Sequence, residues 1–214
     1  MRIIGLTGGI ACGKSTISLT LRQLGAVIID GDALSRALTQ PGGLALPAIR
    51  AEFGGDVFQS DGTLDRRALG SLIFSSDERR RALDELMQPL LRTMIEREIL
   101  RARESGAKIC VLDMPLLYEA GLDTLCDTVW CASLDRETQL TRLMARDGFT
   151  RAEAESRLNS QMDTAEKARR ANVVIPTSGT IQETAALIPP LYQAELAKEN
   201  THGKHADSTA SKTR

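Results

Sequence analysis

A run of glycines followed by a lysine and a serine has the clearest chemical meaning in this sequence. Residues 8–15 read Gly-Gly-Ile-Ala-Cys-Gly-Lys-Ser, which matches the spacing G-x-x-x-x-G-K-[ST] of a phosphate-binding loop, or P-loop. An apolar segment precedes the run and a helical pattern follows it. Glycines let backbone N–H groups turn toward phosphate oxygens, and the N-terminus of the following helix adds partial positive charge. The run therefore predicts a nucleoside triphosphate site.

Two side chains of this loop have separate expected roles. Lys14 would reach the β- and γ-phosphates, and the Ser15 hydroxyl would ligate Mg²⁺. The alternative to a phosphate-binding loop is a glycine-rich turn with an exposed lysine. Cys12 lies near a helix N-terminus that could lower its pKa, but we interpret it as a small residue liable to oxidation and not as a catalytic thiol. The expected ATP-binding residues of the loop are Gly8, Gly9, Ala11, Cys12, Gly13, Lys14, Ser15 and Thr16.

Two carboxylates and an arginine follow the second apolar segment, in the sequence IIDGDALSR. Asp32 is the candidate general base that would accept a proton from an acceptor hydroxyl, and it would also contact the substrate. Asp30 would cap the following helix or orient the site, and helix capping is the alternative reading of both acids. Arg36 comes one turn later and would meet an anionic group of the substrate. The pattern favours phosphoryl transfer to a hydroxyl.

A third acid, Asp113, ends another apolar segment in VLDMPLLYE. An acid at such a position often joins the Mg²⁺ shell, so Asp113 is expected at the metal, directly or through water, and near the substrate. A loop-entry acid without this role is the alternative. Pro115 would fix the direction of the chain, and Leu116 and Leu117 are expected to pack beneath the site, with Leu116 counted as substrate-binding.

Two arginines, Arg142 and Arg146, are four residues apart in RETQLTRLMARD and therefore share a helix face. Such a face fits a mobile lid that closes over the polyphosphate and stabilises the charge of the transition state, with Arg142 as a catalytic residue. A solvated charged face is the competing interpretation. Arg157, in the next helix, is a weaker candidate.

The elements that position these residues alternate between strands and helices. Short apolar segments predict strands at Arg2–Thr7, Ala26–Asp30, Lys108–Asp113, Asp127–Cys131 and Asn172–Pro176. Helical patterns cover Lys14–Leu24, Arg66–Phe74, Leu83–Ser105, Arg136–Arg146 and Arg151–Gln161, with Pro89 bending or resetting the third. The alternation predicts an α/β fold, a doubly wound five-stranded parallel sheet.

The spacing of the strands predicts where the sheet is interrupted. The core would comprise residues 1–31, 105–135 and 169–197, because the gap after the second strand is too long for a simple crossover. Residues 32–104 would form a helical insertion, and residues 136–168 a second, charge-rich helical insertion. The polar tail 198–214 is expected to be disordered, so that the domain as a whole spans 1–197.

Composition excludes several classes of protein. The 214 residues include 27 Lys+Arg and 28 Asp+Glu, a formal charge of -1, and only 3% aromatic residues, so neither nucleic acid nor a membrane surface is an expected partner. The two histidines, His202 and His205, lie in the polar tail, which leaves no histidine for a Ser-His-Asp triad or a zinc site in the body. The four cysteines form no C-x-x-C pair. We expect a soluble, cytoplasmic protein.

Missing motifs narrow the P-loop class. The sequence has neither the D-x-x-G nor the N-K-x-D motif that GTPases need. It also lacks the LSGGQ-type signature of ABC ATPases and the G-x-G of a dinucleotide site. Small-molecule kinases remain. They need an acceptor pocket, an acid that orients the acceptor hydroxyl and a mobile basic lid.

An ordered set of motifs resembles the dephospho-CoA kinase family over residues 1–196. The set comprises TGGIACGKST, IIDGDALSR, DGTLDRRALGSLIF, LDMPLLYEAGL, ETQLTRLMARDGFTRAEAESRL and Gln161-Met162. The resemblance implies ATP-dependent phosphorylation of the ribose 3'-hydroxyl of dephospho-CoA, the last step of coenzyme A biosynthesis, with ATP and Mg²⁺ required. It carries the base over to Asp32, the ATP site to 11–16 and the lid arginines to Arg142 and Arg146. The fold that it implies is of the P-loop nucleotide-kinase type, with residues 32–104 as the helical acceptor-binding insertion and residues 136–168 as the helical lid.

Two departures from the family pattern concern binding and not the phosphate machinery. Gln88-Pro89 stands where the family commonly has His-Pro, and Pro176-Thr177-Ser178-Gly179 replaces an Asp-Asn-type turn where adenine would rest. We still expect an active enzyme. One rival is another P-loop kinase of a nucleoside, sugar or nucleotide, and the other is a non-catalytic nucleotide-binding protein. The sequence leaves the oligomeric state open between a monomer and a small homo-oligomer.

Overall fold

A five-stranded sheet forms the centre of the protein. The computed structural model describes the backbone of residues 1–74 and 76–210 and the side chains of residues 1–73 and 76–199. The strand order is β2-β3-β1-β4-β5, and β1 pairs in parallel with β3 and β4, as β4 does with β5. The strands are β1 (Arg2–Gly8), β2 (Val27–Asp30), β3 (Ile109–Asp113), β4 (Thr128–Ser133) and β5 (Val173–Pro176). The prediction of a five-stranded parallel α/β sheet is confirmed.

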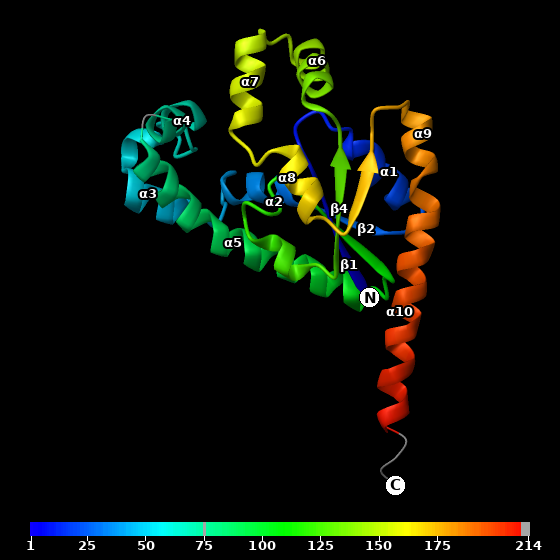
Figure 1. Ribbon diagram of the computed structural model, residues 1–214. Helices are drawn as coiled ribbons and strands as arrows, with labels where there is room; N and C mark the ends of the chain where they lie inside the picture. The colour runs from blue at the N-terminus through cyan, green and yellow to red at the C-terminus, as the bar shows by residue number, and fades with distance from the viewer. Residues whose placement is uncertain (75, 211–214) are drawn as a thin grey trace. The chain divides into compact units, whose positions relative to one another are not determined.

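The chain divides into two compact units, residues 1–29 with 101–214 and residues 30–100. The first unit contains most of the sheet and the following helices (Figure 1): α1 (Lys14–Gln23), α6 (Arg136–Asp147), α7 (Arg151–Asn159), α8 (Thr164–Arg170), α9 (Ile181–Ala186) and α10 (Ile188–Ala210), with the short 3₁₀ turn Leu122–Leu125.

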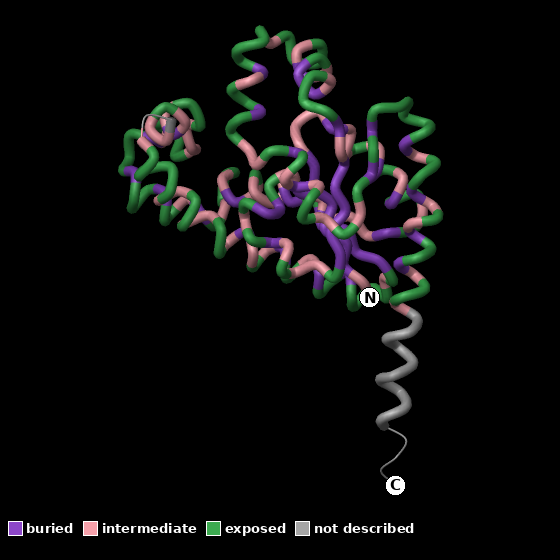
Figure 2. The backbone as a smooth tube through the Cα atoms, viewed as in Figure 1, coloured by how far each residue is buried: buried purple, intermediate pink, exposed green. Residues whose placement is uncertain are grey.

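Helices pack on both faces of this sheet. On one face, α1 packs against β1, β3, α9 and α10, and on the other α8 packs against β1 and β4. The residues Ile4 and Leu6 of β1 contribute to the core beneath α1, where Ile17 and Leu21 are fully buried. Figure 2 shows that buried residues concentrate along the strands. Burial on both faces explains why the strands are apolar without alternation.

The second unit is helical. It contains α2 (Gly31–Leu38), α3 (Leu46–Phe53), a 3₁₀ turn (Gly55–Val57), α4 (Arg66–Phe74) and most of α5 (Asp77–Glu104). The bounds predicted for α4 agree with the structure. The prediction for α5 was wrong at its start, because the helix begins at Asp77, and the helix continues through Pro89 without being reset there. The Pro89 carbonyl still accepts from the Thr93 hydroxyl at 2.9 Å, one turn on.

The units differ in part from the segments expected from the sequence. The second unit spans 30–100 where an insertion was expected at 32–104, and its role in acceptor binding stays a prediction. The expected lid, residues 136–168, comprises α6, α7 and the start of α8 and belongs to the first unit. In α6 and α7, the side chains of Leu140, Leu143, Ala154 and Leu158 form a small apolar core of their own.

The C-terminal tail corrects one expectation. Helix α10 continues to Ala210, so the backbone of 198–210 is helical where disorder was expected from residue 198. The preceding segment AELAKEN consists largely of strong helix formers, which lets the helix extend past the folded body. Residues 211–214 lie outside the described residues. No helix in the described part of the chain is both long and apolar enough to cross a membrane.

One prediction concerns the packing of α1, which begins directly after the P-loop. Leu21 is fully buried beneath the sheet, whereas Leu19 on the same helix is 55% exposed. We expect Leu21→Ala to lower the free energy of unfolding by about 2–5 kcal/mol and Leu19→Ala to change it by less than about 0.5 kcal/mol. Urea denaturation followed by circular dichroism measures both. Equal effects of the two substitutions would contradict this packing.

Candidate active site

The backbone of the P-loop adopts a conformation that exposes N–H groups at the start of α1. Ala11 has a positive φ of 61°, and Gly13, the N-cap of α1, has a φ of 72°. Gly13 has no side chain with which to accept from the first-turn N–H groups, unlike the Asp and Thr caps of other helices here. Uncapped N–H groups and the helix dipole together favour an anion such as phosphate.

The P-loop lysine and the third-strand acid come together. The parallel register of β1 and β3 places Leu6 beside Asp113, at the edge where the P-loop begins. The Lys14 amino group forms an ion pair with Asp113 Oδ1, and the two side chains are 18% and 14% exposed. The sequence placed both residues at a nucleotide site but did not anticipate that they contact each other.

A cleft of about 500 Å³ opens beside the start of α1. Its volume falls within the range of about 300–1,000 Å³ that is common for small-molecule sites. It is lined by the P-loop and α1, by the arginines of α6 and by the segment after β5: Ala11, Gly13, Ser15, Thr16, Arg142, Arg146, Thr177, Gly179, Thr180, Ile181 and Thr184. This cleft is therefore the candidate nucleotide site.

Arg142 and Arg146, the two arginines expected on the lid, both line this cleft, whereas Arg157 contacts a different residue. Arg142 donates from Nη2 to the Thr177 carbonyl at 2.9 Å, which fixes the guanidinium at the cleft wall. Arg146 pairs with the neighbouring Asp147, and this hydrogen-bonded carboxylate raises the pKa of Arg146. Arg157 instead lies 4.1 Å over the ring of Phe149.

The turn after β5 forms another part of the cleft wall, next to Arg142. Thr177 is buried, and its hydroxyl and N–H both donate to the Ser133 carbonyl, at 3.1 and 3.0 Å. Thr180 then starts α9 with a capping box to Glu183. The T-x-x-E spacing of this box could have predicted α9, a helix that sequence analysis missed. The departure from the family pattern at 176–179 therefore still forms an ordered wall.

The candidate base and its neighbours belong to the second unit. Asp30 ends β2 and caps α2, because its carboxylate accepts from the Ala33 N–H at 2.8 Å. This agrees with the capping role considered for Asp30. Asp32 and Arg36 lie in the first and last turns of α2. Their roles at the reacting hydroxyl and at the substrate stay predictions. Gln88 is exposed on α5.

Two side-chain expectations need correction. Leu117 is fully buried, but Leu116 is 37% exposed and does not pack beneath the site as expected. Cys12 is buried at 1% exposure, and burial raises the pKa of its thiol. A buried, protonated thiol is a poor target for oxidation, so the burial of Cys12 argues against the oxidation liability expected from the sequence and agrees with its interpretation as a non-catalytic thiol.

Sequence analysis also missed residues that pack against the P-loop from behind. A Cβ at Gly9 would overlap the Thr164 hydroxyl and approach Gln139 Oε1 within 2.9 Å, so only glycine fits there. Thr164 begins α8, and Gln139 lies in α6, where its Nε2 donates to the Leu134 carbonyl at 2.7 Å. No local pattern marks these residues, because only the fold brings their helices to the loop.

Comparison with known proteins identifies the family. The dephospho-CoA kinase family model, CoaE, matches residues 2–183. A relative from Symbiobacterium thermophilum named dephospho-CoA kinase is 46% identical over 199 residues, which cover 93% of this chain and 83% of the relative. Another of that name, from Geobacter sulfurreducens, is 46% identical over 192 residues, covering 90% and 98%.

Solved structures agree with this assignment. The dephospho-CoA kinase of Campylobacter jejuni is 27% identical, with a TM-score of 0.70 over 94% of this chain and 100% of the other. The protein TT1252 of Thermus thermophilus is 34% identical, with a TM-score of 0.76 over 90% and 97%. The P-loop, the arginine-lined cleft and these matches lead to one conclusion: the chain belongs to the dephospho-CoA kinase family.

Proposed function

We propose that this enzyme transfers the γ-phosphoryl group of ATP to the ribose 3'-hydroxyl of dephospho-CoA, giving coenzyme A and ADP as the final step of coenzyme A biosynthesis. The observation that carries the proposal is the cleft formed by the P-loop, Arg142 and the turn at Thr177, in a chain of this family. The cleft joins a phosphate-binding backbone to a basic wall, which are the two features that a polyphosphate needs.

The first unit would bind ATP. Backbone N–H groups at the start of α1 and the Lys14 amino group would hold the phosphates, while the wall formed by Thr177, Thr180 and Ile181 would face the adenosine. Asp113 contacts the Lys14 amino group and would keep this flexible side chain in place between turnovers. The proposed ATP-binding set keeps the loop residues 8, 9 and 11–16 together with Arg142 and Arg146.

The second unit would supply the acceptor side. Asp32 would accept the 3'-hydroxyl proton as the oxygen attacks phosphorus in line with the leaving ADP. Arg36 in the same helix would pair with a phosphate of dephospho-CoA. Support for both roles comes from chain position, because Asp32 follows the end of β2 by two residues, and ligands of such sheets bind beyond the carboxyl ends of the strands.

The donor set fits Mg²⁺. Ser15 is exposed in the cleft, and Asp113 offers a second oxygen ligand, directly or through water. Hard oxygen donors of this kind, completed by phosphate oxygens and water, are what Mg²⁺ prefers. Bound there, the ion would neutralise the charge that develops on the phosphate oxygens.

The lid would complete the site. Arg142 and Arg146 lie on the cleft face of α6, and Ile10 and Ala11 of the P-loop pack against the apolar core of α6 and α7. Closure of residues 136–168 would bring the Arg142 guanidinium to the γ-phosphate and exclude water, which limits hydrolysis of ATP.

We also propose a cytoplasmic location and either a monomer or a small homo-oligomer. All four cysteines are free thiols, which a reducing compartment maintains. The small-molecule acceptor dephospho-CoA would be the partner, with neither nucleic acid nor a membrane involved.

The first test of the function is ADP production with Mg-ATP in the presence and absence of dephospho-CoA. We expect turnover that depends on dephospho-CoA and falls about 10²–10⁴-fold in Asp32→Asn, because the general base is lost. ATP binding should persist in the variant. Asp56→Asn, which removes an exposed acid of the same unit, is the control. ATP binding without turnover would indicate a non-catalytic protein, and turnover with other acceptors alone would indicate another kinase.

The arginines provide a second prediction. Arg142→Ala should lower kcat about 10²–10³-fold, the usual loss when one donor to the transition-state charge is removed. Arg157→Ala should have a much smaller effect, because Arg157 stacks on Phe149 and does not line the cleft. Steady-state kinetics of both variants decide between a lid with a catalytic arginine and a merely solvated charged face, for which the two effects would be alike.

The metal proposal makes a third prediction. Ser15→Ala should raise the Mg²⁺ concentration for half-maximal rate by at least about tenfold, as expected when a group around a metal is removed. Thr20→Ala is the matched control, because its hydroxyl donates only to the Thr16 carbonyl within α1. Titration of the rate with Mg²⁺ at saturating ATP measures this. An unchanged Mg²⁺ requirement would remove Ser15 from the metal shell.

A further inference from the structure

A lysine with no assigned role is completely buried near the site. The side chain of Lys167, in α8, has 0% exposure. Its amino group donates to the Pro115 carbonyl at 2.5 Å and pairs with Glu119 Oε1 at 2.9 Å. Burying an ammonium group is unfavourable unless it is paired and hydrogen-bonded, and an apolar residue of similar size often fills such a place at less cost. The charge therefore calls for an explanation beyond packing.

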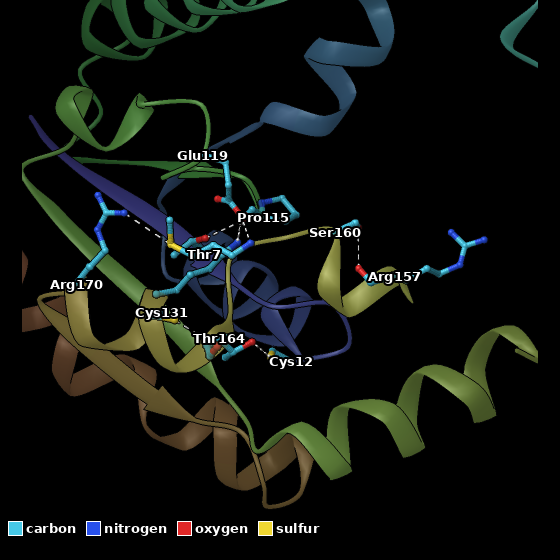
Figure 3. Close-up of polar contacts among 12 residues, drawn as sticks. Thr7, Cys12, Pro115, Glu119, Cys131, Arg157, Ser160, Thr164 and Arg170 are labelled. Atoms are coloured by element: carbon cyan, nitrogen blue, oxygen red, sulfur yellow. Dashed lines mark hydrogen bonds and ion pairs between the residues drawn. The ribbon is translucent and has the colours of Figure 1, made fainter. Parts of the chain in front are cut away.

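The carbonyl that Lys167 binds belongs to the loop that follows Asp113. The same Pro115 carbonyl accepts from the Thr7 hydroxyl at 2.9 Å, and Thr7 lies in β1 just before the P-loop (Figure 3). The next residue back, Met114, donates its N–H to the Leu6 carbonyl at 3.0 Å. Thr7 of β1 and Lys167 of α8 thus both donate to the Pro115 carbonyl. Pro115 follows Asp113, whose carboxylate contacts Lys14, by two residues.

The carboxylate that Lys167 binds makes a second connection. Glu119 Oε1 also accepts from the N–H of Met162, at 2.9 Å, in the segment between α7 and α8. Glu119 therefore holds α8 through Lys167 and the connection before α8 through Met162. The loop after β3 and the end of the lid segment are joined at one oxygen atom.

The N-terminal residue of α8, Thr164, contacts the P-loop. The Thr164 hydroxyl donates to Gln139 Oε1 at 3.2 Å and lies 3.8 Å from the Cys12 sulfur, as Figure 3 shows for Thr164 and Cys12. It also occupies the space that a Cβ at Gly9 would need. Gln139 belongs to α6, which carries Arg142. One short helix thus contacts the elements that carry Lys14, Asp113 and Arg142.

We propose that Lys167 is a positioning residue for phosphoryl transfer. By binding the Pro115 carbonyl and Glu119, it fixes the loop after β3 and keeps the Asp113 carboxylate in contact with the Lys14 amino group. This inference rests on the proposed function in one respect, the effect of Lys167 on the rate of phosphoryl transfer. ATP would still bind to the P-loop backbone when Lys167 is removed, but the loop that carries Asp113 would lose an anchor. A shift of about 1 Å in such a group can cost about 10²-fold in rate.

The test compares Lys167→Met with Arg169→Met. Methionine keeps an unbranched, apolar side chain of similar length, and Arg169 is a 78% exposed cation of the same helix, so its loss controls for charge. We expect Lys167→Met to lower kcat by at least about tenfold with a KM for ATP within about threefold of the parent, and Arg169→Met to change neither.

Hydrogen exchange supplies a readout that does not depend on activity. The amides of residues 114 and 116–120 should exchange faster in Lys167→Met than in the parent, while amides of β4 keep their protection. Unchanged exchange in this loop, or an unchanged kcat, would overturn the proposal, as would a uniform loss of protection with kcat and KM both altered. If Lys167→Met does not fold, Glu119→Gln is measured in the same way, because it weakens the same anchor and leaves the lysine bonded to Pro115.

Different results would contradict the proposed function and the positioning role of Lys167. A parent enzyme that shows no turnover with dephospho-CoA would contradict the proposed function. In that case faster exchange of the amides of residues 114 and 116–120 would still establish that Lys167 holds the loop, and unchanged exchange would show that it does not.

Discussion

The parallel pairing of β1 with β3 is the constraint on which the rest of the first unit depends. It brings the start of the P-loop and Asp113 to the same edge of the sheet, where Lys14 and Asp113 form their ion pair. Asp113 is 99 residues from Lys14 in the chain. Only a sheet whose strands pair out of sequence order can place a loop after the first strand beside an acid after the third.

The segment between β4 and β5 contributes further residues to the same edge of the sheet. Helix α6 carries Arg142 to the cleft and Gln139 to the back of Gly9, while α8 lies against the opposite face of the sheet from α1. The same segment therefore contributes to the cleft and to the support of the loop that the cleft needs. If this segment acts as the proposed lid, its position would be coupled to the P-loop, because α6, α7 and the P-loop share apolar contacts.

Long, regular patterns were predicted well, and their interruptions were not. The strands were located to within two residues because continuous β-branched segments, flanked by polar residues, have few alternatives to a buried strand. Helix α5 was predicted six residues short at its start, because its first turns, including Glu78-Arg79-Arg80-Arg81, are too polar to show an apolar periodicity. Helices α8 and α9 are only seven and six residues long, too short for periodicity to reveal them.

Local sequence patterns were enough to predict the residues proposed for the chemistry: a P-loop with its lysine and serine, acids at the ends of two strands, and a pair of arginines on one helix face. Each of these is a local pattern, in which backbone geometry or helical spacing ties function to neighbouring residues. Tertiary structure alone decided which residues meet, such as Lys14 with Asp113, Arg142 with Thr177, and Lys167 with Pro115 and Glu119. Such contacts join residues 35 or more positions apart, and a buried charge in particular leaves no local signal, since lysine on a polar helix looks exposed until the fold encloses it.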